Sequence, residues 1–202
     1  MAVDLEPYGD RFAKICLQWD KAEEDIKLAE QVAHKVVFPA IKELRYAGRR
    51  IIEALNKSRT RGQKNDVDSL LQDAEFNCLR ARHDAIDAAT AKVAVDLEIA
   101  TNKIGYAAIL AAMPNFSELH NLLNEIRDKV RKSRRNRDNR EEIYEIIETT
   151  DFKALVEKYR TFQASEPIMI KLASKERFHR VINYGVGGCG VVGLIITILT
   201  LL

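Results

Sequence analysis

Side chains that commonly bind metals or act in catalysis are few in this chain and lie far apart in the sequence. The histidines are His34, His83, His120 and His179. None has a partner at the HExxH or ExxH spacing that would place metal ligands on one helix face, so we expect surface histidines or histidines with satisfied hydrogen bonds. The cysteines, Cys16, Cys78 and Cys189, form no CxxC pair, which argues against a zinc site and a disulfide framework. We therefore expect no enzyme active site and no cofactor.

The densest charged stretch is a basic run at residues 127–140. It holds eight Lys or Arg against two Asp, and five acids without a base follow between Glu141 and Asp151. Such a run can bind anionic lipid headgroups, at roughly 1 kcal/mol per basic residue near a membrane surface, or nucleic-acid phosphates. No aromatic residue interleaves the run, which disfavours single-stranded nucleic acid as a partner. We predict a lipid or anion site at Lys129, Arg131, Lys132, Arg134, Arg135 and Arg137; in the alternative interpretation these bases only pair with the adjacent acids.

The 22 residues from Val181 to Leu202 carry no charge. As a helix that rises about 1.5 Å per residue they would span ~33 Å, close to the ~30 Å hydrocarbon thickness of a bilayer. Juxtamembrane basic residues precede them at Lys175, Arg177 and Arg180, so the positive-inside tendency predicts a body that stays in the cytoplasm. We predict a single-pass C-terminal transmembrane anchor. The alternative is a buried helix of a soluble bundle, although the segment has no strong polar face.

Small residues recur at every fourth position of the predicted anchor, at Gly185, Cys189, Gly193 and Thr197. A stripe of this kind lets two transmembrane helices approach closely, so we assign these four residues to packing between anchors in a homo-oligomer. The glycines of this region do not form a phosphate-binding loop, because the preceding strand and the Lys-Ser/Thr ending are missing.

Apolar residues ahead of the anchor follow the alternating three-four spacing that predicts amphipathic helices. The apolar seams cover residues 12–36, 41–55, 70–111 and 116–130. Pro39 separates the first two seams. The third would form one helix as far as Ala112 unless Gly105 bends it. Ser165 with Pro167 predicts that the last helix restarts there, which would keep a continuous heptad seam from running into the anchor.

These elements predict an all-α fold: an antiparallel helical bundle with long, coiled-coil-like helices and a C-terminal transmembrane helix. The alternative is an extended coiled coil that completes its core only on dimerisation. We expect a cytosolic bundle of four main helices at residues 1–138, a connector of short helices with a basic juxtamembrane end at residues 139–180, and the anchor at residues 181–202.

The anchor, joined to a seam-bearing body without a catalytic constellation, favours a non-enzymatic, membrane-anchored helical module that binds a protein partner or self-assembles. The alternative is a membrane-perturbing effector of the toxin or defence kind, whose glycine-rich tail inserts and oligomerises. The expected partners are the lipid bilayer and either another protein or a second copy of the chain.

Overall fold

A computed structural model describes residues 6–59, 64–135 and 138–175, and every regular element in these ranges is a helix. The elements up to α3 are η1 (Glu6–Tyr8), α1 (Gly9–Ala33), α2 (Phe38–Lys57) and α3 (Lys64–Ile104). They are followed by α4 (Tyr106–Ala112), α5 (Phe116–Arg135), α6 (Arg140–Ile146) and a π-helix, η2 (Ile147–Phe152). A further helix at residues 153–175 continues directly from η2. We call α6, η2 and this helix, residues 140–175, the arm.

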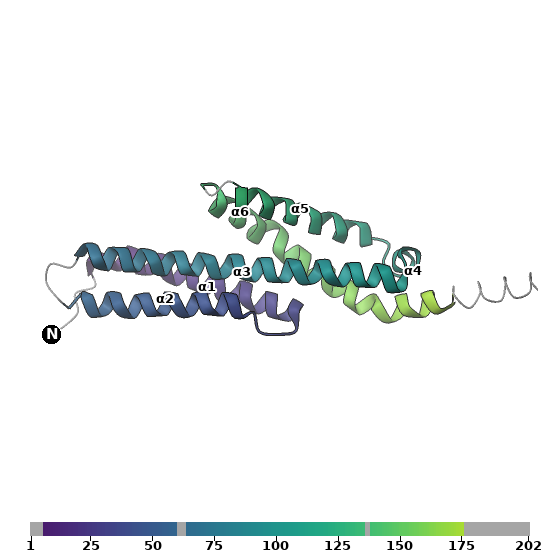
Figure 1. Cartoon of the computed structure of the whole chain (residues 1–202), viewed down its shortest axis with the longest axis horizontal. Helices are drawn as coiled ribbons and strands as arrows, with labels where there is room; N and C mark the ends of the chain where they lie inside the picture. Colours follow the sequence, from purple (N-terminus) through teal and green to yellow (C-terminus); the bar gives the residue numbers. More distant parts are fainter. Residues whose placement is uncertain (1–5, 60–63, 136–137, 176–202) are drawn as a thin grey trace, which may run out of the picture.

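The long helices run antiparallel to their neighbours in the chain around α3, the longest of them (Figure 1). The first half of α3 packs against α1 and α2, and its second half packs against α5 and the arm. Two ion pairs show that α2 and α3 are antiparallel. Lys57 at the end of α2 pairs with Asp66 at the start of α3, and Glu43 near the start of α2 pairs with Arg80 further along α3. The predicted antiparallel helical bundle is confirmed for the part of the chain that the structure describes.

The apolar seams close against one another within one chain. A single buried cluster includes side chains of α1, α2, α3, α5 and the arm, among them Ile86, Leu123, Ile126 and Phe152. A smaller buried cluster around Tyr8 lies where the N-terminal part of α1 meets the N-terminal part of α3. Fully burying a large apolar side chain contributes about 1.5–3 kcal/mol relative to leaving it exposed. The described body therefore has its own core, without a second copy of the chain.

Gly105 separates α3 from α4 and changes which side chains of α4 are buried. Its φ of 95° is a conformation that only glycine adopts readily, so of the two alternatives left open, an uninterrupted helix or a bend at Gly105, the structure has the bend. The resulting turn shifts the register of α4. Ala108 and Ile109 are buried there, whereas Ala107 and Ala111, which continue the three-four spacing of the predicted seam at residues 70–111, are exposed.

Alanines, and not the larger apolar residues, form most of the buried face of α2. Ala40, Ala47 and Ala54 are buried together with Leu44, while the predicted seam residue Ile41 is exposed. The small side chains let α2 approach the alanine-rich face of α3 closely, and this packing outweighs the burial of isoleucine. The predicted seam of α2 is therefore wrong for Ile41.

The predicted restart at Ser165 and Pro167 is wrong, because residues 153–175 form one helix. Pro167 is exposed, so water can reach the carbonyl that its missing N–H leaves without a partner. Phe162 and Met169 are buried on either side of it and hold the helix against the bundle. The expected interruption ahead of the anchor is therefore not present at this position.

The predicted boundary between residues 138 and 139 falls in the turn between α5 and α6. Tyr144, Ile147 and Phe152 beyond this turn belong to the same core cluster as Leu119 and Ile126 before it. The division of the chain into domains stays a prediction, but the arm is packed into the bundle.

None of the helices in the described ranges is both long enough and apolar enough to cross a membrane. Several predicted residues lie outside those ranges: the anchor at residues 181–202 with Gly185, Cys189, Gly193 and Thr197, and also Arg137, Arg177 and Arg180. Lys175 is the last described residue and is exposed. The predicted anchor therefore stays a prediction.

Candidate functional site

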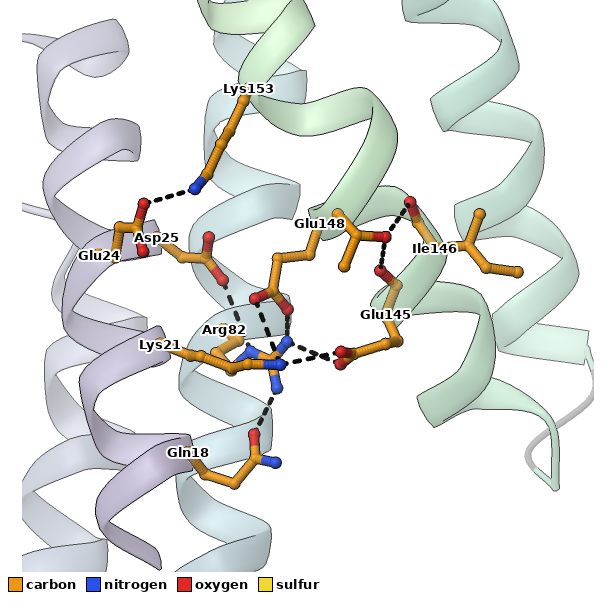
Figure 2. Close-up of polar contacts among 10 residues, drawn as sticks. Gln18, Lys21, Glu24, Asp25, Arg82, Glu145, Ile146, Glu148 and Lys153 are labelled. Carbon is orange, nitrogen blue, oxygen red and sulfur yellow. Dashed lines mark hydrogen bonds and ion pairs between the residues drawn. The ribbon is translucent and has the colours of Figure 1, made fainter. Parts of the chain in front are cut away.

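A cluster of charged side chains is buried where α1, α3 and the arm meet (Figure 2). Arg82 of α3 is 3% exposed and Asp25 of α1 is 2% exposed. The Arg82 guanidinium pairs with Glu148 and, at 3.1 Å, with Glu145, and it donates a hydrogen bond to Gln18. Asp25 Oδ2 lies 3.6 Å from Arg82 Nε, which is too long for a hydrogen bond. Arg82 thus joins α1 to the arm, with Asp25 as its most distant acid.

Lys21 of α1 adds a second cation to this cluster. Its Nζ lies 2.9 Å from Glu145 and 4.0 Å from Glu148, the same two acids that Arg82 contacts. Two cations therefore face two well-placed carboxylates, and Asp25 is the surplus acid. Further polar pairs continue the contact between α1 and the arm: Glu24 with Lys153, Gln31 with Arg160, and His34 with Gln163. The arm contacts α1 largely through polar side chains, whereas the apolar side chains of the arm belong to the core that it shares with α3 and α5.

Burial shifts two ionisable groups in this region in opposite directions. It raises the pKa of Asp25 from 3.8 to about 7, against the opposing charge of Arg82. It lowers the pKa of His83 from 6.5 to about 3, with further lowering by the charges of Arg140 and Arg82. In both cases the neutral form is favoured, because removing a charge from water is costly.

His83 also connects α3 to α6 and, through a neighbour, to α5. Its ring stacks on Tyr144 with the ring centroids 3.7 Å apart. The Tyr144 hydroxyl donates a hydrogen bond of 2.8 Å to Asp87, which also accepts one of 2.9 Å from Arg134 of α5. His83 Nδ1 is buried without a hydrogen-bond partner, so the expectation of a surface or satisfied histidine is wrong here. The space beside His83 and Arg82 leaves no room for a ligand. We therefore interpret the whole cluster as a set of contacts that positions the arm.

The predicted anion-binding residues are partly engaged in ion pairs within the chain. These pairs are Lys129 with Asp151 at 2.5 Å, Arg134 with Asp87 at 2.9 Å, and Arg131 with Asp128. Lys132 and Arg135 are exposed, and the described part of the chain supplies neither with an ion-pair partner. Lipid or anion binding by these residues stays a prediction, with fewer unpaired charges than the sequence suggests.

The basic run also lies far from residue 175, the last described residue ahead of the predicted anchor. Helices continue from residue 140 to residue 175, which are 36 residues and roughly 50 Å at about 1.5 Å per residue. The turn between α5 and α6 lies toward one end of this span and residue 175 at the other (Figure 1). Charges are screened over ~8 Å at physiological ionic strength. The basic run would therefore reach the bilayer that holds an anchor only if the body lay along its surface.

Two grooves flank the second half of α3. One, of about 810 Å³, lies between α3 and α5 and has Arg127, Arg131 and Arg134 along its α5 wall. The other, of about 720 Å³, lies between α3 and the arm and includes Ile99 and Ile170. Because a groove between two helices depends on tertiary packing, the apolar seams alone did not reveal either one.

The fold and the cluster together define an all-helical bundle in which buried charges join the arm to the first helix. Within the described ranges, no three histidine, cysteine, aspartate or glutamate side chains gather in a way that could hold a metal ion. Comparison with protein-family models, curated proteins and solved structures finds no match for the chain.

Proposed function

We propose that the protein is a non-enzymatic, membrane-anchored helical module that binds a protein partner or assembles with itself. The observation that carries the proposal is the course of the arm. Residues 153–175 form one helix, and the uncharged segment 181–202 follows shortly after it in the sequence. Exposed Lys171, Lys175 and Tyr106 lie toward this end of the bundle. Basic and aromatic side chains of this kind suit the interface between a bilayer and water.

The closed core of the body supports separate roles for the body and the anchor. Because the apolar seams are buried within one chain, self-assembly does not have to complete the core of the body. We therefore assign self-assembly to the small-residue stripe of the anchor, which includes Gly193, and protein binding to the surface of the body.

Alkaline carbonate extraction of membranes from cells that express the full chain tests the anchor. The wild type should stay in the membrane pellet. A variant with Leu194→Asp and Ile196→Asp should move to the supernatant, since a charge at the centre of a membrane helix costs about 2.5–3.5 kcal/mol on insertion scales. Leu194→Ala with Ile196→Ala is the matched control and should stay in the pellet. Extraction of the wild type would overturn the membrane anchor.

The oligomeric state in detergent micelles tests the stripe separately. Gly193→Leu should reduce the fraction of cross-linked dimer, because the larger side chain separates the two helices. Val192→Leu, beside the stripe, should leave that fraction unchanged. Equal dimer fractions for the two variants would refute the packing role of Gly193 without affecting the anchor.

The groove between α3 and the arm favours one second candidate, a membrane-perturbing effector that holds its tail until triggered. For this function, adding the full chain to dye-loaded vesicles with anionic lipid should release the dye. Carbonate-resistant insertion without release would count against the effector and leave the anchored module in place.

A further inference from the structure

The groove between α3 and the arm lies in line with α1, beyond the C-terminal end of that helix. α1 packs between α3 and the arm until it ends at its C-cap, His34. There the His34 ring lies 3.0 Å from Gln163, which also lines the groove. Beyond this point α3 and the arm continue without α1 between them (Figure 1). The groove is thus a helix position that α1 is too short to fill.

The walls of this groove are largely apolar. Ile104, Phe162 and Ala173 line it together with Ile99 and Ile170, of which the last two are strongly exposed. An apolar helix in this position would cover these side chains in the way that α1 covers its neighbours, since apolar surface is driven out of water.

Four of the polar side chains that line the groove bond to one another, while Lys103 and Glu166 add further charged side chains to its lining. Lys92 donates to Asp96 at 2.6 Å, and the Tyr159 hydroxyl also donates to Asp96. Gln163 Nε2 donates to the Tyr159 hydroxyl at 3.1 Å. These bonds leave the part of the groove around Tyr159 better suited to an uncharged occupant than to a charged one.

We propose that the groove is the docking site of residues 190–202 of the same chain, which occupy it as a helix when no membrane is present. This segment is uncharged, and its 13 residues would form a helix of about 20 Å. The groove is lined from Lys92 to Ile104 on α3 and from Tyr159 to Ser174 on the arm, which correspond to about 18 and 22 Å. The 14 residues between Lys175 and Gly190, among them Gly185, Gly187 and Gly188, supply the reversal of direction, so that residue 190 would lie beside the end of the groove at Ser174. Glycine tolerates the turn conformations that this connection requires.

Position favours the chain's own segment over a separate partner. The groove extends to Ser174 of the arm, and the uncharged segment follows in the same chain shortly after it. A short tether gives an effective concentration in the millimolar range, which a second copy or a free helix would have to exceed. The inference deepens the proposed function, because it gives the anchor segment a place in the body before it enters a bilayer.

Disulfide formation in the membrane-free full chain tests the docking directly. In an antiparallel arrangement, residue 194 would lie near residue 170. Leu194→Cys combined with Ile170→Cys, in a background with Cys16→Ser and Cys189→Ser, should form an intramolecular disulfide. Ile168→Cys is the matched control, since Ile168 and Ile170 are 55% and 53% exposed on the same helix but only Ile170 lines the groove. We expect Ile170→Cys to cross-link at least about tenfold faster. Equal rates, or a disulfide between two chains, would overturn the proposal.

A second pair of variants tests the consequence of docking without engineered cysteines. Ile170→Glu places a charge in the groove and should release the segment, so the full chain should bind neutral phosphatidylcholine vesicles faster than the wild type. Ile168→Glu should bind at the wild-type rate. The same rate for both variants contradicts the docking. Carbonate extraction tests the anchor independently, so that failure of the docking and failure of the anchor can be told apart.

Discussion

Replacing Asp25 by asparagine tests whether this carboxyl stabilises the bundle as a partner of Arg82 or costs stability as a buried charge. Arg82 already contacts Glu145 and Glu148, while Asp25 lies 3.6 Å away without a hydrogen bond. Burial raises the pKa of Asp25 from 3.8 to about 7. Since one pKa unit corresponds to about 1.4 kcal/mol, keeping this charge in the folded state costs up to about 4 kcal/mol.

The sign of the pH dependence follows from the raised pKa. Between pH 3.8 and about 7 the folded state binds more protons at Asp25 than the unfolded chain does. The stability contributed by the neutral carboxyl is fully present below pH 3.8 and is lost as the pH rises through about 7. Asparagine does not ionise. Relative to the wild type, Asp25→Asn should therefore gain stability across this window and reach up to about 4 kcal/mol above it.

Urea denaturation of both proteins, followed by circular dichroism at intervals across this pH window, measures the difference in the free energy of unfolding. Glu24→Gln is the control. Glu24 is the exposed neighbour of Asp25 and pairs with Lys153 at 2.6 Å, so its replacement should change stability by less than about 1 kcal/mol. If Asp25→Asn is instead less stable than the wild type above pH 7, the charge of Asp25 supports Arg82 and the reasoning is refuted.

Three further changes have expected outcomes in the same denaturation assay. Arg82→Met should cost about 3–5 kcal/mol, because it leaves buried acids without their cation, whereas Arg135→Met, at an exposed position without an ion-pair partner among the described residues, should cost less than about 1 kcal/mol; similar losses for the two would contradict the cluster. His83→Phe should flatten the acid side of the pH profile. The pKa of His83 is lowered from 6.5 to about 3, so the wild type loses stability as the pH falls through that range. Gly105→Ala should cost about 1–3 kcal/mol because φ is 95° there. Gly48→Ala, in regular helix, should gain roughly 0.5–1 kcal/mol, and the opposite order would refute the conformational argument.

The helix α5 shows where the sequence predicts structure well. Its seam from Phe116 to Val130 consists of large apolar residues at three-four spacing, and each of the predicted positions is buried. The residues between them are mostly polar or charged, so only one face of the helix can be buried at low cost. The contrast between the two faces determines the register.

The helix α2 shows why the same reasoning fails elsewhere. Ile41 and Ile52 lie on one side of this helix and alanines on another, so both faces are apolar enough to be buried. The alanine face faces the core because α3 also presents alanines, and two small-residue faces approach more closely than a small and a large one. That choice depends on the partner helix, which a single seam does not contain.

The buried ion cluster could have been detected in the sequence, but a search for apolar periodicity alone misses its charged residues. Arg82 lies on the same face of α3 as Cys78 and Ala85, and Asp25 lies between the buried Ala22 and Ala29 of α1. A charge at a seam position has to find a buried partner, since an isolated one is too costly. The two charges could have been paired from this observation. Their link to Glu148 could not, because it depends on how the arm packs.

The unequal lengths of α1 and α3 connect the two proposals. Since α1 has 25 residues and α3 has 41, the unfilled part of the bundle lies beside the end of the arm at Ser174. A segment docked there would need only to straighten its glycine-rich turn to enter a bilayer, and the bundle itself would not have to open. If the body then stood upright on that bilayer, the basic run would be roughly 50 Å from it.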